Sequence, residues 1–369
     1  MSDELAGRSE YEVLVLSSRT ELDEPQSAQL QALLREGTIR WRYLMRLAGY
    51  HGIQPLLYYH LREQEDVPGD ILAQLRSVVG ARSAHSLVLT QELGRLGELF
   101  EREGIPLLAV KGPVLAHTVY GGVALRPFAD LDLVIRRDDF DRVDELLHGE
   151  GYGSASLTPF QKASYLFIHG QYSFWRRVAS MGSAAVFLDV HTAIMPPGYS
   201  YAEDFDDLYA RSIALPMAGT DVHALEREDL LQVLCYHGLK NRWDRLKYIC
   251  DVAEFLRTYP DLDWNTVHAR ARAMHSERVL RLGLSLAHRL LGAPLPPEIA
   301  RDVEGDRRVE ALTEALLGRL PQQAHMEVEP YLDRVRLNVL SQDGLVGGLR
   351  YGAYAAARRV SELYLPEND

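Results

Sequence analysis

The sequence has few of the features that mark secreted and membrane proteins. It contains only two cysteines, Cys235 and Cys250, and no Cys-x-x-C pair. Two thiols are too few for a disulfide framework, so we expect both to be reduced and buried. Nowhere do about 18 apolar residues follow one another, as a membrane-spanning helix requires. The chain opens on acidic residues rather than on a basic segment and an apolar stretch. These absences predict a cytoplasmic protein with no membrane partner.

Positive charge is also scarce. The 52 acidic residues outnumber the 40 basic ones, which gives a formal net charge of −12. Binding to nucleic acid without sequence preference depends on a basic surface, so we expect no non-specific nucleic-acid binding. A local basic groove remains compatible with this balance. With 369 residues and a hydrophobic content of 47%, the chain is long and apolar enough to bury a substantial core.

The most informative residues present are three carboxylates on two short apolar runs. Asp130 and Asp132 lie in the run 129–135 (Ala-Asp-Leu-Asp-Leu-Val-Ile), and Asp189 lies in the run 186–191 (Val-Phe-Leu-Asp-Val-His). Because strand side chains alternate between faces, Asp130 and Asp132 are predicted to project from one side while the leucines enter a core. A neighbouring strand would bring Asp189 beside them. An isolated Asp-x-Asp more often consists of solvated residues on an edge strand, but three clustered carboxylates require a cation.

Carboxylate oxygens without thiolates are typical ligands of hard ions. Mg²⁺ in particular is held by a few carboxylates together with the phosphates of a substrate, and Mn²⁺ is the alternative ion. Two such ions, about 3.5–4 Å apart, polarise both the attacking and the leaving oxygen of a phosphoryl displacement. The three carboxylates therefore predict a site for a nucleoside triphosphate (NTP) and two Mg²⁺ ions.

A Lys-Gly turn precedes the carboxylates. Residues 105–110 are predicted to form a buried strand, and residues 113–120 are compatible with a helix that has Pro113 in its first turn. Gly112 at such a junction allows backbone N–H groups to approach an anion. Lys111 could then reach the triphosphate as a point charge. The alternative is an exposed lysine at the end of a strand.

Three further residues are candidates for the same site. Arg126, four residues before Asp130, either holds the triphosphate or pairs with an acid. Lys240 is our choice for a phosphate contact within the basic segment 240–247, whose alternative is a solvated helix surface. His191 shares a strand face with Asp189. Since Mg²⁺ prefers oxygen, His191 is predicted to support a ligand rather than to bind the ion itself.

The order of the predicted elements indicates three regions. Residues 1–103 are predicted to be mainly helical, residues 104–195 to form the core, and residues 196–369 to form a helical C-terminal domain. Within the core, residues 165–175 are expected to supply another strand. The fold class is therefore α+β, with a small mixed β-sheet between helical regions.

The residues that carry chemistry also resemble a known family. They are similar to the bacterial uncharacterised nucleotidyltransferase family of the DNA polymerase beta-type nucleotidyltransferase superfamily. The matching residues are Leu108–Ala116, Tyr120, Arg126–Ile135, Leu146-Leu147 with Gly151-Tyr152, Leu188–His191, Leu234–Lys247 and Asp251. The resemblance implies transfer of a nucleoside monophosphate (NMP) from an NTP, with ATP as the expected donor, to an acceptor hydroxyl with release of pyrophosphate. The resemblance does not decide whether the acceptor is a small molecule, a peptide or an RNA end.

The resemblance also implies roles for the carboxylates. By analogy, Asp130 and Asp132 bind both metal ions, and Asp189 completes the site for the ion that activates the acceptor hydroxyl. Members of the superfamily usually carry Gly-Ser in the turn, whereas this chain has Lys111-Gly112. Lys111 would then hold the phosphates in place of the backbone amides and serine of other members. Two alternatives stay open: a nucleotide-binding accessory protein without turnover, and a tRNA-directed, toxin-like nucleotidyltransferase.

Overall fold

The architecture is a mixed β-sheet with helices around it, as the α+β prediction requires. The computed structural model describes residues 8–178, 185–201, 203–321 and 331–362. Within these residues the strands form one seven-stranded sheet of order β3-β4-β5-β2-β1-β7-β6. The strands are β1 (Leu107–Val110), β2 (Leu131–Ile135), β3 (Gly153–Ser154), β4 (Gln171–Arg177), β5 (Ala185–His191), β6 (Ile213–Met217) and β7 (Thr220–Ala224).

Helices precede the sheet, connect its strands and follow it. Those before the sheet are α2 (Arg8–Leu16), α3 (Glu24–Arg35), α4 (Trp41–His51), α5 (Gln54–Leu61) and α6 (Gly69–Arg102). Those between strands are α7 (Gly112–Thr118), the short 3₁₀ helix η1 (Arg137–Asp139), α8 (Phe140–Gly149), α9 (Pro159–His169) and α10 (Phe205–Ala210). After the sheet come α11 (Arg227–Lys240), α12 (Leu246–Thr258), α13 (Trp264–Ala273), α14 (Glu277–Leu291), α15 (Pro297–Glu304), α16 (Arg307–Arg319), α17 (Tyr331–Ser341) and α18 (Gly344–Ser361).

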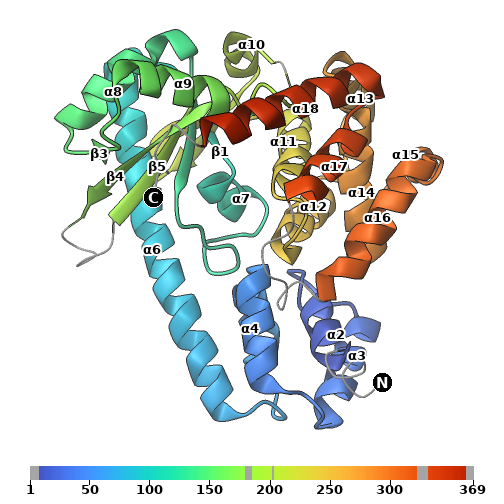
Figure 1. The fold of residues 1–369 in the computed structure, drawn as a ribbon. Helices are drawn as coiled ribbons and strands as arrows, with labels where there is room; N and C mark the ends of the chain where they lie inside the picture. Colours follow the sequence, from blue (N-terminus) through green and yellow to red (C-terminus); the bar gives the residue numbers. More distant parts are fainter. Residues whose placement is uncertain (1–7, 179–184, 202, 322–330, 363–369) are drawn as a thin grey trace.

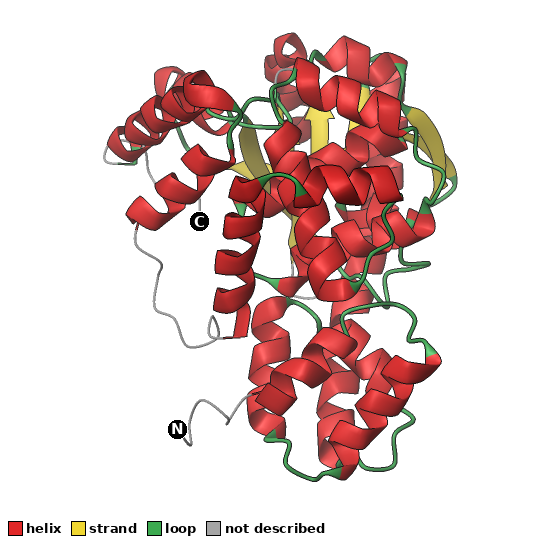
Figure 2. Ribbon diagram, turned by 90° about the vertical axis from the view of Figure 1, so that its right-hand side faces the viewer, coloured by secondary structure: helices red, strands yellow, loops and turns green. Residues whose placement is uncertain are grey.

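The central strands of the sheet follow from their sequence patterns. All four residues of β1 are buried, as expected for a strand covered on both faces. In β2 the alternating residues Leu131, Leu133 and Ile135 are buried, as their spacing predicts. β2 pairs antiparallel with β1 and parallel with β5, so the sheet is mixed. Figure 2 shows the strands enclosed between helices.

The segment expected to be a strand over residues 165–175 divides between a helix and a strand. Thr158 caps α9 through a capping box with Gln161, and Pro159 occupies the first turn. Gly170, with a φ of 69°, ends this helix in the left-handed conformation, and β4 begins at the next residue. Local capping therefore outweighs the apolar pattern of residues 165–169.

The N-terminal helices reach the sheet through α6, a helix of 34 residues. Figure 1 shows α6 running from the N-terminal helices up to the sheet. It packs on the β6–β7 hairpin at Gly94, where a Cβ atom would lie 2.9 Å from the Cβ of Ala218. The hairpin comes from beyond residue 195, so the sheet extends past the boundary expected for the core. In the part of the chain described here, no helix combines the length and the apolar character needed to cross a membrane.

Candidate active site

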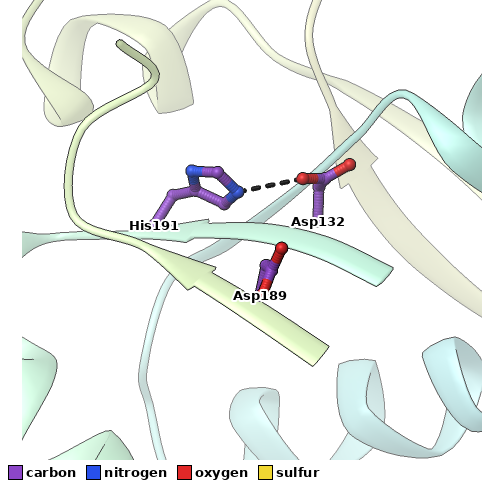
Figure 3. Close-up of side chains that lie close together, drawn as sticks. All are labelled: Asp132, Asp189 and His191. Atoms are coloured by element: carbon purple, nitrogen blue, oxygen red, sulfur yellow. Dashed lines mark hydrogen bonds and ion pairs between the residues drawn. The ribbon is translucent and has the colours of Figure 1, made fainter. Parts of the chain in front are cut away.

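Two of the predicted carboxylates lie side by side at the centre of the sheet. A single row of residues crosses β4, β5 and β2, with Ser173 paired to Asp189 and Asp189 paired to Asp132. Residues in one row project from the same face, so both carboxylates point the same way (Figure 3). Ligand atoms of Asp132, Asp189 and His191 all lie within 4.8 Å of one another. The juxtaposition that the strand patterns predict for Asp132 and Asp189 is present.

Asp132 carries the strongest electrostatic environment of this group. Its Oδ2 lies 3.1 Å from Lys111 Nζ, and its Oδ1 lies 2.9 Å from His191 Nε2. Burial alone would raise the pKa of Asp132, but the Lys111 charge and the hydrogen bond from His191 outweigh it and hold this pKa well below its usual range. Asp132 is therefore a permanent carboxylate.

Asp189 is fixed by hydrogen bonds from β4. Ser173 Oγ donates to Asp189 Oδ1 over 2.5 Å, and Gln171 Nε2 donates to Asp189 Oδ2 over 3.2 Å. Both donors lie on the strand next to β5. Such neutral donors orient a carboxylate without cancelling its charge, so Asp189 keeps its capacity to bind a cation.

Asp130 lies directly before the strand rather than within it. β2 begins at Leu131, and Asp130 occupies the bend before it, so the prediction that both acids of the Asp-x-Asp pair sit in the strand is wrong by one residue. Asp130 does not belong to the close group formed by Asp132, Asp189 and His191. Desolvation within the site, together with the Asp132 and Asp189 charges, raises the pKa of Asp130, although its side chain reaches solvent. A bound cation would relieve that repulsion.

The Lys-Gly turn adopts a backbone conformation that favours glycine. Lys111 has φ of 55° and ψ of −124° and immediately precedes α7. A non-glycine residue in this region is strained, and such strain persists where surrounding contacts impose it. Here the Lys111–Asp132 ion pair holds the side chain, and the Gly112 carbonyl accepts a hydrogen bond of 3.2 Å from Arg126 Nη1. The turn thereby directs an ammonium group at the carboxylates.

Lys240, at the end of α11, lies near the same carboxylates. Its Nζ donates to Gln171 Oε1 over 3.2 Å, and Gln171 in turn holds Asp189. Desolvation and the Lys111 charge lower the pKa of Lys240 to about 8, against the opposing effect of the carboxylates. His237 on the same helix lies 3.5 Å from Lys111 Nζ, and burial keeps its pKa well below the usual value. His237 is therefore a neutral structural partner of Lys111.

The lowered pKa of Lys240 predicts that anion binding depends on pH. The charged groups around it are Lys111 and Arg358, which lower its pKa, and Asp132 and Asp189, which raise it. Because the ammonium loses its proton above about pH 8, an anion that needs its charge must then bind together with a proton. We expect nucleotide affinity to fall by up to about tenfold per pH unit above that point. Lys240→Arg should flatten this profile in calorimetric titrations, and an equally flat wild-type profile would contradict the assignment.

Arg126 pairs with an acid, which is one of the two roles predicted for it. Its Nε and Nη2 donate to the two carboxylate oxygens of Asp251 on α12, both over 2.8 Å. Tyr120 Oη donates to the same carboxylate over 2.9 Å. Desolvation acts against the Arg126 charge, but Asp251 raises the pKa of the guanidinium beyond its ordinary value. With its bond to the Gly112 carbonyl, Arg126 joins the Lys-Gly turn to the C-terminal helices.

Comparison with protein-family models decides the family of this chain. Residues 37–292, well over half of the 369 residues, match the family described as uncharacterised nucleotidyltransferase. The chain belongs to this nucleotidyltransferase family. The match spans every candidate site residue and confirms the resemblance found in the sequence. The protein is therefore an enzyme of the class that transfers nucleotidyl groups from nucleoside triphosphates.

No curated protein matches this nucleotidyltransferase. Among solved structures, it is similar to the antibiotic-resistance factor ANT(2'')-Ia, whose structure was determined in solution. The two share 13% sequence identity over 54% of this chain and 92% of that one, with a TM-score of 0.30.

The carboxylates of the nucleotidyltransferase open into a polar cleft of about 560 Å³. Its lining includes every residue predicted for the carboxylate site and the phosphate contacts, namely Lys111, Gly112, Arg126, Asp130, Asp132, Asp189 and Lys240. The structure therefore brings these residues to one cavity. A more apolar hollow of about 1130 Å³ lies between α16, α17 and α18, but it shares no residue with the cleft. The cleft that holds the carboxylates is therefore the candidate active site.

Some residues around the carboxylates and the cleft were missed by sequence reasoning. Ser173 and Gln171 were not singled out, because their contact with Asp189 depends on the pairing register of β4 and β5. Gly52 and Ile53, at the junction of α4 and α5, line the cleft although they lie far outside the predicted core. No local pattern in the N-terminal helices signals this contact. In the sequence, the basic residues after Lys240 indicate that α12 contributes to the lining of the cleft.

Proposed function

We propose that this nucleotidyltransferase moves an NMP group from an NTP, with ATP as donor, to an acceptor hydroxyl and releases pyrophosphate. The observation that carries the proposal is the register of β2 and β5, which places Asp132 and Asp189 next to each other on one face. Two carboxylates that share a cleft with several cations are suited to a metal-bound polyphosphate. The proposed acceptor is a small molecule, a peptide or an RNA end.

The donor set fits a hard divalent ion. Asp130, Asp132 and Asp189 would hold Mg²⁺, with Mn²⁺ as the alternative and two ions as the proposed stoichiometry. All three supply oxygen, and the raised pKa of Asp130 reflects desolvation and a carboxylate repulsion that a cation would relieve. When bound, the metal would neutralise charge on the phosphates and make the acceptor hydroxyl more acidic. His191 would orient Asp132 through its 2.9 Å hydrogen bond.

The phosphates would be held by cationic groups beside the carboxylates. Lys111 from the turn and Lys240 from α11 would supply positive charge, and the backbone at Gly112 would allow close approach. Arg126 also lines the cleft, and its guanidinium keeps N–H groups beyond those that Asp251 and Gly112 accept. We therefore propose Arg126 both as a brace for the turn and as a nucleotide contact.

The cytoplasm is the proposed location of this reaction. Cys235 and Cys250 are both free and buried, which agrees with a reducing compartment. That compartment supplies NTP and Mg²⁺.

The test is a direct assay of the wild-type chain. Each of the four NTPs, labelled on the α-phosphate, is incubated with Mg²⁺ or Mn²⁺ and a panel of hydroxyl acceptors. We expect metal-dependent pyrophosphate release together with transfer of the label to one acceptor class, and no product when a chelator is added. Release of inorganic phosphate in place of pyrophosphate would contradict nucleotidyl transfer.

A further inference from the structure

A second group of cations lines the cleft, apart from those near the paired carboxylates. Arg245 and Lys247 lie at the start of α12, and both line the cleft. Within the described residues neither forms an ion pair with a carboxylate. Instead, the Arg245 guanidinium lies over the ring of Tyr50 at 5.4 Å, and Lys247 Nζ lies 5.0 Å from the ring centroid of Tyr248. These aromatic contacts position the two charges, and Asp251 and Asp130 act on Lys247 from beyond ion-pair distance.

Helix stability does not account for cations at this position. The N-terminus of a helix carries partial positive charge and favours acidic residues, yet Arg245 is the N-cap of α12, and its first turn contains no acid. Burial and the Arg126 charge lower the pKa of Lys247, and Asp251 and Asp130 only oppose this shift. A pair of cations that the local fold disfavours is explained by a ligand that requires them.

The N-terminal helices hold these cations in place. Gly52, with φ of 72°, ends α4 directly against the Lys247 side chain, and a Cβ atom there would lie 2.9 Å from Lys247 Cδ. The backbone N–H of Leu246 donates to the buried His51 Nδ1 over 3.2 Å. The turn between α4 and α5 is therefore shaped around the start of α12.

Two rings connect this cation pair with the phosphate-side lysines. His237 lies 3.5 Å from Lys111 Nζ and meets the Tyr248 ring edge-on at 5.1 Å between centroids. Tyr248 in turn contacts Lys247. Lys111 and Lys240 thus lie near Asp132 and Asp189, whereas Lys247 contacts Tyr248 and Arg245 contacts Tyr50. The cleft therefore holds two pairs of cations, one beside Asp132 and Asp189 and one at the start of α12, where Lys247 also faces Asp130 and Asp251.

The charges that line the cleft include more cations than carboxylates. Its basic residues are Arg82, Lys111, Arg126, Lys240, Arg245 and Lys247, and its acidic residues are Asp130, Asp132, Asp189 and Asp251. Asp251 is neutralised by Arg126, and Asp132 is paired with Lys111. In a chain with a net charge of −12, this local excess of cations selects an anion.

We propose that Arg245 and Lys247 form a subsite for an anionic group of the acceptor, a carboxylate or a phosphate. The nucleotidyltransferase would thus accept hydroxyl compounds that carry negative charge and reject neutral or cationic ones. This inference rests on the proposed function insofar as the bound anion is the acceptor. The N-terminal helices take part in acceptor selection because Gly52 and His51 fix the start of α12.

The test uses matched three-carbon probes that differ in charge. Glycerol 3-phosphate, glycerate, glycerol and 2-amino-1,3-propanediol are titrated calorimetrically into the full chain with Mg²⁺ and a non-hydrolysable NTP. We expect the two anions to bind and the neutral and cationic probes not to bind. The tighter of the two anions identifies phosphate or carboxylate as the recognised group. Failure of both anions to bind at millimolar concentration would overturn the subsite.

Variants separate the subsite from the nucleotide site. Lys247→Met keeps a side chain of similar length against Gly52 and removes the charge, and Arg245→Gln removes the second cation. Together they should weaken anion binding by about tenfold or more while changing affinity for the NTP analogue by less than about twofold. Lys247→Arg should retain binding, and Arg76→Gln, at an exposed position on α6, is the matched control.

Two contrary results are distinguishable. Equal losses of anion and NTP-analogue affinity in the double variant would assign Arg245 and Lys247 to the triphosphate and overturn the acceptor subsite. Absence of nucleotidyl transfer by the wild-type chain would overturn the proposed function. The subsite is tested separately from it, because the titrations measure anion binding without turnover.

Discussion

Replacing Asp132 by asparagine should reduce nucleotidyl transfer by about a thousandfold, the largest catalytic effect we expect from one substitution. The change keeps the shape of the side chain but removes its negative charge, which lies 3.1 Å from Lys111 Nζ and 2.9 Å from His191 Nε2. It therefore removes a charged ligand from the proposed metal site and leaves the Lys111 ammonium without its partner. The measurement is the rate of label transfer from the NTP at saturating nucleotide.

The control for this experiment is Asp221→Asn. Asp221 lies on β7 of the same sheet, is exposed and does not line the cleft. It should retain wild-type activity, and circular dichroism should show both variants to be folded. An Asp132→Asn enzyme that keeps transfer within about tenfold of the wild type would contradict the role assigned to this carboxylate.

Replacing Asp251 by alanine should lower the free energy of unfolding by about 3–5 kcal/mol, the largest effect on stability we expect. Side-chain exposure is 6% for Asp251 and 17% for Arg126, so the substitution leaves a buried guanidinium without a counterion. Tyr120 loses its acceptor at the same time. Urea unfolding of the wild type and the variant measures the difference.

Two further variants establish the cause of this loss. Arg126→Met combined with Asp251→Leu removes both charges and should recover most of the stability, because replacing a whole buried pair costs far less than breaking it. Asp261→Ala breaks the exposed ion pair with Arg227 and should cost less than about 1 kcal/mol. Equal losses for Asp251→Ala and Asp261→Ala would show that burial does not set the strength of the Arg126 pair.

The centre of the site was predictable because period-two alternation fixes the side from which a strand residue projects. The runs around Asp132 and Asp189 contain few alternatives to a half-buried strand, so their faces followed directly from the sequence. The start of β2 was less secure. Strand ends depend on pairing with a neighbour, and β2 pairs with β5 from Leu131 and with β1 from Asp132, which leaves Asp130 in the bend.

The parts of the site that sequence reasoning could not place depend on long-range packing. Arg126 and Asp251 are 125 residues apart, and the sequence alone left Arg126 divided between a phosphate and an acid. Ser173 meets Asp189 through a register that neither strand encodes by itself. The approach of Gly52 to Lys247 joins the N-terminal helices to α12 and leaves no periodic signal in either segment.

The bond between Arg126 and Asp251 also bears on attempts at dissecting the enzyme. A recombinant fragment that stops at Ala224 would contain every strand of the described sheet and all three proposed metal ligands. It would nevertheless lack Asp251 and would retain the Arg126 side chain that this carboxylate neutralises. A minimal catalytic unit must therefore extend at least through α12, and truncation libraries are best designed from that limit.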